Sequence, residues 1–362
     1  MGTPLPGCDH SVAVLGHFAD GSRRVDGQIV RTRVIRDELY RCIGQSRVIS
    51  ADTGFLSSRP LRSLWRLNRV LRRAEALVIL PGCRGLRWLL PLYIRWKQRT
   101  GGRLHYVAIG GWLPRHLQDH PQQISQLLAC DGIYVQTRRM KDELDNLGLT
   151  RVHMLPNFRR FPKDRATSED LAIPIRLVFL SRVTEEKGVG LAVEAVKQVN
   201  REAGETRATL TIYGPVQSGQ EKWFGELSKG FTPDIQYAGA LRPEDIHAQL
   251  VRFDGLLFPT WYNGEGFPGV LVDAMIAGLP VIASNWIDIP EFVEEGVTGA
   301  LVPVKDLRSL VVKIQEWTRS PDDVLRMKAC AADRAMQFHV DTVWPAFMER
   351  LFPKTLSELA GE

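Results

Sequence analysis

Short runs of hydrophobic residues alternate along the chain with segments whose hydrophobic residues recur at helical spacing. Runs of four to six mainly apolar residues between turn residues are typical of strands buried on both faces. The predicted strands are residues 11–16, 47–50, 76–80, 105–109 and 132–135, and then 175–180, 208–213, 235–238, 255–258 and 280–283. Between them the spacing is helical, as in Val189, Ala192, Val193 and Val196. This alternation predicts an α/β fold with parallel sheets that carry helices on both faces.

The alternating pattern occurs twice, and a polar stretch at residues 159–172 separates the two series. With 362 residues, the chain is long enough for two α/β domains, each with its own core. We place the first domain at residues 1–160 and the second at 161–340, with a last helix within about 341–362. The expected architecture is two doubly wound, Rossmann-like domains facing a central cleft, where ligands bind at the carboxyl ends of the strands.

The composition is that of an ordinary globular protein, with 44% hydrophobic and 24% charged residues. No pair among the five cysteines has zinc-ligand spacing, and an odd number of cysteines without a secretion signal favours a reducing compartment. Residues 1–10 do not resemble a signal peptide, and no apolar run reaches the length of about 18 residues that spans a membrane. We therefore expect a cytoplasmic protein.

Positive charge is concentrated in the first half of the chain. Residues 1–165 hold 28 Lys and Arg against 13 Asp and Glu, a net charge of +15, whereas the remainder has a net charge of −9. Residues 59–103 contain 12 of these cations and a single acid, Glu75, interleaved with aromatic residues such as Trp65, Trp88 and Trp96. An amphipathic helix with solvated arginines and an anionic membrane surface explain this segment about equally well. A nucleic-acid site is the weaker interpretation, and we expect no nucleic-acid partner.

Two carboxylates, Glu265 and Asp273, flank a glycine- and proline-rich turn at residues 266–269. The turn predicts that a helix begins near Gly269, with Glu265 on the loop before it and Asp273 in its first turns. Free N–H groups at the start of a helix bind anions. This arrangement suits a ligand with a phosphate in the middle and hydroxyl groups at both ends, such as a nucleotide sugar.

Residues 263–303 resemble the donor-binding segment of retaining GT-B glycosyltransferases of glycosyltransferase family 4 (glycosyl transferases group 1), many of which act in polysaccharide biosynthesis. That family carries a Glu-x7-Glu motif followed by an Ala-Gly-x-Pro-Val-Ile-Ala strand. Here Glu265 matches the first acid and Asp273, one methylene shorter, stands at the second. The resemblance implies that Glu265 acts on the donor sugar and that Asp273 holds the ribose. It also implies that Phe267, Pro268, Gly269 and Val270 lie at the donor diphosphate.

A second segment resembles the same family. Ser181-Arg182 follows a predicted strand, and Lys187-Gly188 precedes a helix, as in the family's Arg-x4-Lys-Gly motif. Two cations near a helix start suit a departing nucleoside diphosphate, because its negative charge grows as the glycosidic bond breaks. The resemblance therefore gives Arg182 and Lys187 catalytic roles beside Glu265. Ion pairs of these cations with Glu185 or Glu186 are the alternative.

The resemblance suggests further positions in both domains. Gly27 and Gln28 stand where the family has a glycine loop near the donor, and Gly214 follows a strand of the second domain where relatives approach the nucleotide. Relatives often place a histidine after a first-domain strand; here Gly110 and Gly111 occupy that turn and His116 comes later, so these three are candidate sugar or acceptor contacts. His17 is a second candidate, and Asn157 matches a hinge.

The chain is therefore expected to be a hexosyl- or related glycosyltransferase that uses a nucleoside-diphosphate sugar and a glycan or lipid-linked glycan acceptor. The resemblance also implies an N-terminal acceptor domain, a C-terminal donor domain, and a last helix that packs back on the first domain. No Asp-x-Asp motif or cluster with metal spacing occurs, so neither a metal nor another cofactor is expected. The alternatives are a sugar- or lipid-binding relative without transferase activity and a nucleotide-sugar epimerase. Peripheral attachment to the cytoplasmic membrane face would follow from the basic segment.

Overall fold

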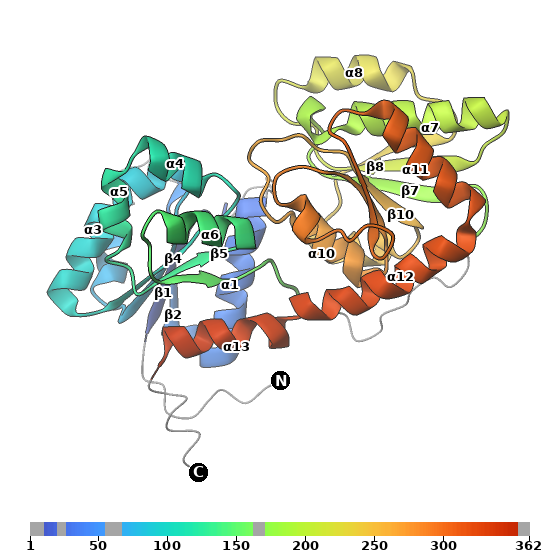
Figure 1. The fold of residues 1–362 in the computed structure, drawn as a ribbon. Helices are drawn as coiled ribbons and strands as arrows, with labels where there is room; N and C mark the ends of the chain where they lie inside the picture. The colour runs from blue at the N-terminus through green and yellow to red at the C-terminus, as the bar shows by residue number, and fades with distance from the viewer. Residues whose placement is uncertain (1–10, 20–26, 55–66, 162–170, 354–362) are drawn as a thin grey trace, which may run out of the picture. The chain divides into compact units, whose positions relative to one another are not determined.

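The computed structural model describes residues 11–19, 27–54, 67–161 and 171–353, and the chain divides into two compact units. Unit 1 is Met1–Asn157 with Val343–Glu362, and unit 2 is Phe158–Thr342. Part of the predicted linker, part of the basic segment, and both ends of the chain lie outside the described residues. Each unit has its own parallel sheet, as Figure 1 shows, and its own hydrophobic core.

Unit 1 follows the predicted alternation of strands and helices. Its elements are β1 (Val12–Gly16), α1 (Gly27–Ile43), β2 (Val48–Asp52), β3 (Ala76–Leu80), α3 (Cys83–Thr100), β4 (Arg103–Val107), α4 (Leu113–Asp119), α5 (Gln122–Leu127), β5 (Gly132–Val135), α6 (Arg138–Asn146) and β6 (Val152–Met154). The strands form a six-stranded parallel sheet in the order β2-β1-β3-β4-β5-β6. The direction of winding reverses between β1 and β3, which makes this the switch point of the sheet.

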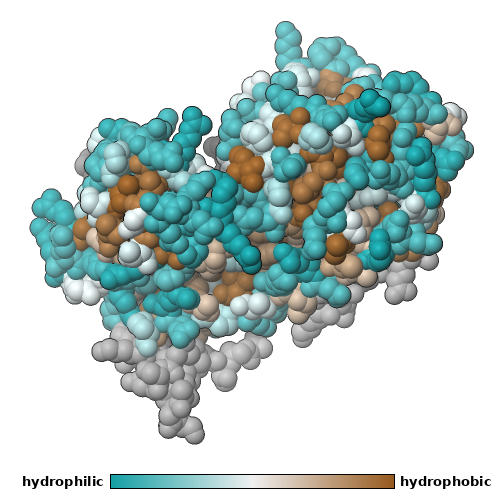
Figure 2. All heavy atoms as spheres, viewed as in Figure 1, coloured by the Kyte–Doolittle hydropathy of each residue, from teal (hydrophilic) through white to brown (hydrophobic). Residues whose placement is uncertain are grey.

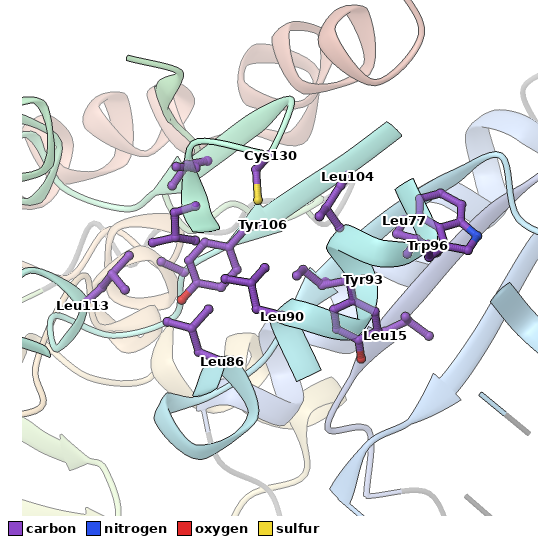
Figure 3. Close-up of a cluster of buried hydrophobic side chains, with 14 of the residues drawn as sticks. Leu15, Leu77, Leu86, Leu90, Tyr93, Trp96, Leu104, Tyr106, Leu113 and Cys130 are labelled. Atoms are coloured by element: carbon purple, nitrogen blue, oxygen red, sulfur yellow. The ribbon is translucent and has the colours of Figure 1, made fainter. Parts of the chain in front are cut away.

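The two faces of the unit 1 sheet carry different helices because successive strand residues point to opposite sides. On one face, side chains such as Leu15, Leu77 and Tyr106 pack with α3, α4, α5 and α6. Figure 3 shows this cluster, in which Leu86 and Leu90 of α3 lie beside Tyr106, and Tyr93 of the same helix lies beside Leu15. The last helix, α13 (Val340–Leu351), also packs in unit 1, where its Phe347 ring lies 4.8 Å from Tyr134 and its Trp344 donates to Cys42.

Unit 2 repeats the architecture with a second series of elements. They are β7 (Ile175–Leu180), the short helix Glu185–Lys187, α7 (Val189–Ala203), β8 (Ala208–Tyr213), α8 (Glu221–Lys229), β9 (Ile235–Gly239), α9 (Ile246–Leu250), β10 (Gly255–Phe258), α10 (Gly269–Ile276), β11 (Val281–Ser284), β12 (Gly299–Val302), α11 (Leu307–Arg319) and α12 (Pro321–Ala335). The parallel sheet has the order β12-β11-β10-β7-β8-β9, so its switch point lies between β7 and β10.

The hydrophobic pattern of α7 explains how the unit 2 sheet is covered. Its five buried positions from Val189 to Val196 form one stripe against Leu177 and Phe179 of β7, together with α11. Burying a valine side chain contributes roughly 1.5–3 kcal/mol, so this stripe fixes the helix on the sheet. The opposite face packs on α10 through residues such as Leu271 and Met275. The predicted doubly wound α/β fold is confirmed.

The strand boundaries differ from the predictions in a few places. The fourth strand runs over residues 103–107 and not 105–109, because Arg103 and Leu104 pair with the start of β3 and Gly110 turns the chain with a φ of 79°. The edge strands β6 and β12 escaped prediction.

Hydrophilic residues cover most of the face seen in Figure 2, and the hydrophobic residues on it form interrupted patches. Within the part of the chain that the structure describes, no helix has both the length and the apolar character needed to cross a bilayer.

Candidate functional site

The loops that follow β7 and β10 meet at the switch point of unit 2. Gly188 ends the first loop with a φ of 81°, and a Cβ there would lie 2.0 Å from the carbonyl oxygen of Pro259 in the second loop. Only glycine allows this approach. The close contact brings Lys187, next to Gly188, against the loop that carries Glu265.

Lys187 and Glu265 form a buried ion pair. The Lys187 Nζ lies 2.5 Å from Glu265 Oε2, and the two residues are 6% and 7% exposed. The hydroxyl of Thr260 donates to the same carboxylate oxygen at 3.1 Å. Burial lowers the pKa of Lys187, and the Glu265 carboxylate acts in the opposite direction and favours the charged form. Glu265 therefore helps to keep a buried lysine protonated.

An aromatic ring and a second cation complete this cluster. The Tyr262 ring lies 4.7 Å from Lys187 Nζ and 5.5 Å from the guanidinium carbon of Arg182. Cation–π attraction therefore holds both cations beside one ring. Arg182 also donates to the Gln217 side chain at 2.9 Å. The structure thus brings Arg182, Lys187 and Glu265 together, as the sequence predicted, and their catalytic roles stay predictions.

The predicted turn and helix start follow Glu265. Helix α10 begins at Gly269, with Pro268 as its N-cap and no side-chain cap. Gly269 and Val270 supply first-turn N–H groups, which have no partner within a helix. Pro268 has no N–H, so it shapes the turn and donates nothing to a diphosphate. The Phe267 side chain stacks on Phe292 at 3.6 Å and serves the core.

Asp273 lies one turn into α10 and is engaged by an arginine. Arg159 donates to both of its carboxylate oxygens, at 2.8 and 3.2 Å. Both side chains are largely shielded from solvent, at 20% and 15% exposed. A bidentate pair of this kind fixes the carboxylate in one orientation. The ribose-binding role of Asp273 stays a prediction, and any ribose hydroxyl would share an oxygen with Arg159.

Gly214 is required by packing at the end of β8. Its φ is 136°, and a Cβ would lie 1.7 Å from the Ser181 carbonyl oxygen, beside Arg182. Its N–H donates to the Gly239 carbonyl at 2.8 Å. Gly214 therefore lets the loops after β7, β8 and β9 pack together, and its contact with the donor stays a prediction.

In unit 1, Gly27 and Gln28 open α1. A Cβ on Gly27 would meet nothing within 4 Å, so no close approach explains a glycine here. The Gln28 side chain donates to the Leu80 carbonyl at 3.3 Å and thereby ties the start of α1 to the end of β3. His17, the other candidate histidine, contacts Asp52 at 3.2 Å.

Gly110 and Gly111 follow β4, and Gly110 belongs to a buried amide network. Its N–H donates to Gln136 Oε1 at 3.1 Å, and Gln136 Nε2 donates to Asn157 Oδ1 at 3.0 Å. Gln136 and Asn157 are 3% and 7% exposed. The network orients the turn after β4. A sugar contact of Gly110 or Gly111 stays a prediction.

His116 has partners on both ring nitrogens. Nδ1 lies 3.2 Å from Cys83 Sγ, and Nε2 lies 3.1 Å from Gln123 Oε1. A sugar or acceptor contact through either nitrogen would have to displace one of these partners. Its predicted role as such a contact is untested.

Sequence reasoning missed several members of these clusters. Thr260, Tyr262 and Arg159 contact the predicted residues, but no motif or spacing distinguished them. The best indication in the sequence would have been Tyr262, an aromatic residue between the end of a predicted strand and Glu265. Among the residues that the structure describes, no three His, Cys, Asp or Glu side chains form a candidate metal site. That the protein needs no metal stays a prediction.

Part of unit 2 is similar to a known protein family. Residues 174–320 match the family described as Glycosyl transferases group 1, and this range holds Arg182, Lys187, Glu265 and Asp273. The chain is 31% identical over 222 residues to the amylovoran biosynthesis glycosyltransferase AmsK of Erwinia amylovora. The aligned region covers 59% of this chain and 53% of AmsK. It is also 31% identical over 159 residues to the putative colanic acid biosynthesis glycosyltransferase WcaL of Salmonella typhimurium, covering 42% of this chain and 38% of WcaL. The chain thus spans about half of AmsK and less of WcaL.

The whole fold matches solved structures. The crystal structure of Anabaena Alr3699/HepE in complex with UDP and glucose superposes with a TM-score of 0.72, covering 94% of this chain and 99% of that one at 15% identity. Such low identity establishes the fold alone. The similarity to the group 1 glycosyltransferases thus lies in residues 174–320, and the two Rossmann-like domains have the fold of the GT-B type.

Proposed function

We propose that this protein transfers a sugar from a nucleoside-diphosphate sugar to an acceptor hydroxyl, with retention of configuration at the anomeric carbon. The buried Lys187–Glu265 pair at the switch point of unit 2 carries this proposal. Removing charges from water is costly, and buried charges commonly mark sites with a chemical task. The relatives named for amylovoran and colanic acid biosynthesis support a glycan acceptor in polysaccharide biosynthesis.

In this mechanism the cations act on the leaving group. Lys187 and Arg182 stabilise the nucleoside diphosphate as the bond from phosphate oxygen to the anomeric carbon breaks and negative charge develops. The N–H groups of Gly269 and Val270 at the start of α10 add to this stabilisation. Glu265 holds Lys187 in its charged form and contacts the donor sugar. Asp273 contributes to the ribose end.

Retention is explained by attack from the face that the diphosphate leaves. The departing phosphate then accepts the proton of the acceptor hydroxyl, so no separate pair of carboxylates is needed for acid and base catalysis. Such pairs in glycosidases stand roughly 5–9.5 Å apart as two free carboxyl groups. Glu265 is instead engaged by Lys187 and Thr260.

We further propose a lipid-linked acceptor and attachment of unit 1 to an anionic membrane surface. Helix α3 contains no acidic residue, and its exposed side includes Arg84, Arg87, Arg95 and Arg99. Trp88 on the same side is 74% exposed. A tryptophan among arginines suits the headgroup region of a bilayer, where each cation contributes about 1 kcal/mol of attraction to anionic lipid.

Two experiments test these proposals. Purified protein is incubated with common sugar nucleotides and lipid-linked acceptors, and nucleoside diphosphate release and the anomeric configuration of the product are measured. No release from any donor would refute the transferase proposal, and an inverted product would refute retention.

For the membrane, sedimentation with phosphatidylglycerol vesicles is compared with phosphatidylcholine vesicles. We expect the triple variant Arg84→Ala, Arg87→Ala, Trp88→Ala to lose binding to the anionic vesicles. A control with Arg201→Ala and Arg308→Ala, two exposed arginines of unit 2, should bind as the wild type does. Equal sedimentation of all three proteins would exclude α3 as the attachment site.

A further inference from the structure

A cysteine, a histidine and a glutamine form a cluster in unit 1 that the proposed transfer reaction does not use. Cys83 is exposed, and its Sγ lies 3.2 Å from His116 Nδ1. The opposite nitrogen, His116 Nε2, lies 3.1 Å from Gln123 Oε1. Gln123 is 3% exposed, so its side chain is held in place by the packing of α5. A nucleophile, a base and a group that orients the base are the parts of an activated nucleophile.

The hydrogen bonds define which nitrogen can take a proton. A carbonyl oxygen only accepts, so Gln123 Oε1 selects the tautomer of His116 that carries its proton on Nε2. Nδ1 then presents a lone pair to the Cys83 thiol. When the thiol proton moves to Nδ1, the imidazolium donates to both neighbours, and the thiolate keeps its hydrogen bond.

The start of α3 is a favourable place for a thiolate. Cys83 is the first residue of this 18-residue helix, and its N-cap, Gly82, makes no side-chain cap. First-turn N–H groups and the positive end of the helix dipole stabilise a negative charge there. Arg84 and Arg87 belong to the same first turns, and the helix contains no Asp or Glu.

The other described cysteines lack this environment. Cys130 lies within the core seen in Figure 3, and burial raises the pKa of its thiol to about 12. Cys42 accepts a hydrogen bond from the Trp344 indole at 3.2 Å. Cys330 is partly buried on α12. Reactive cysteines are exposed and lie in positive surroundings, which among the described cysteines fits Cys83 alone.

We propose that Cys83 and His116 form a thiol–disulfide exchange site, at which a low-molecular-weight disulfide modifies Cys83. His116 Nδ1 takes the thiol proton, and the thiolate attacks one sulfur of the disulfide. The S–S bond of the small molecule breaks as the new one forms, and the leaving thiolate takes the proton back from His116. Cys83 is oxidised to a mixed disulfide, and half of the small molecule is reduced to a free thiol.

The probe for this reaction is 5,5′-dithiobis(2-nitrobenzoic acid), whose released thiolate is followed by its absorbance at neutral pH. The full chain carries Cys8→Ser, because Cys8 lies outside the described residues. Site-resolved mass spectrometry identifies the modified cysteine. We expect Cys83 to react first and about tenfold faster in the folded chain than in the same chain unfolded in urea.

Variants separate proton transfer from simple exposure. His116→Asn keeps a polar group near Nδ1 but cannot hold the proton, and should slow the reaction about tenfold. Gln123→Leu should slow it as well, whereas Gln123→Glu retains the acceptor and the rate. His120→Asn is the matched control, because the His120 ring lies 4.6 Å from the His116 ring but takes no part in the proposed proton transfer. The rate of this variant should stay within about twofold of wild type.

Two results would overturn the proposal. The first is that Cys83 reacts no faster in the folded chain than in the unfolded chain. This comparison uses no variant of His116 or Gln123, so it does not depend on how those variants fold. The second is a His116→Asn protein with an unchanged melting temperature and an unchanged rate. Oxidised glutathione, followed by intact mass, then shows whether a physiological type of disulfide forms the same adduct.

Discussion

In both units, polar side chains are buried at the carboxyl ends of the strands of a parallel sheet. Neutral amides are buried there in unit 1, and an ion pair is buried there in unit 2. In unit 1 the amides of Gln136 and Asn157, at 3% and 7% exposure, form one such buried network. In unit 2 the charged Lys187 and Glu265, at 6% and 7%, form another. An amide that is fully hydrogen-bonded is inexpensive to bury, whereas an ion pair pays a desolvation penalty that its own attraction often fails to repay.

This difference indicates where the chemistry lies. The amide network links the turn after β4 to the chain after β6, so its role follows from the fold of unit 1. The ion pair links two loops that the close contact at Gly188 already joins. Its charge is therefore more than this contact requires, and the proposed diphosphate ligand would account for it.

The largest effect is expected from removing the buried cation. Lys187→Ala should lower nucleoside diphosphate release by roughly 10²–10³-fold, as loss of one preorganised charge at a developing anion does. It also leaves Glu265 buried without its partner, so the melting temperature should fall. Lys222→Ala, at an exposed lysine of α8, is the control and should retain activity. Equal rates for the two variants would remove Lys187 from the mechanism.

A pH effect on stability is expected in unit 1. Burial lowers the pKa of His105 from 6.5 to about 4, and its Nδ1 lies 3.1 Å from the Tyr134 hydroxyl. Between these pH values the unfolded chain binds more protons than the folded one, so stability is lost as the pH falls from 6.5 towards 4. The full loss is about 3 kcal/mol. In urea unfolding, His105→Gln should lose less free energy of unfolding across this pH range than the wild type does. An identical loss in the two proteins would show that His105 is not the group responsible.

A smaller effect is expected from neutralising the partner of Lys187. Since Glu265 raises the pKa of Lys187 and burial lowers it, Glu265→Gln should lower the pKa of Lys187 further. The alkaline limb of donor binding should then move to lower pH, because only the protonated lysine attracts the diphosphate. Donor affinity measured by calorimetry across the alkaline range tests this. A limb that stays in place or moves upward would show that Lys187 does not control binding.

The smallest effect is expected at Asp273. If it holds the ribose, Asp273→Asn should weaken nucleotide binding several-fold, by roughly 1 kcal/mol for one hydrogen bond. Arg159→Gln breaks the same ion pair but leaves the carboxylate, so it separates the two roles. Equal affinity of wild type and Asp273→Asn for the nucleoside diphosphate would show that the aspartate serves Arg159 alone.

Much of the fold could be read from the sequence because buried parallel strands are near-continuous apolar runs. Arg182, Lys187 and Glu265 were also predicted, since they belong to motifs at strand ends. The contacts of Asp273 with Arg159 and of His116 with Cys83 were not. Each joins residues more than 30 positions apart whose side chains meet only after α3, α4 and α10 have packed. The need for glycine at particular positions also depends on such contacts. At position 214 the carbonyl oxygen of Ser181, and not a residue next to it in the sequence, leaves no room for a Cβ.

Donor binding tests the central claim most directly. Thermal shift of the wild type, Lys187→Ala and Lys222→Ala is measured with UDP-, GDP-, ADP- and TDP-sugars, since a ligand that binds the folded state raises the melting temperature by mass action. The charged switch point of unit 2 predicts that at least one donor stabilises the wild type and Lys222→Ala but not Lys187→Ala. A donor that stabilises all three proteins equally would contradict it, as would the absence of any shift.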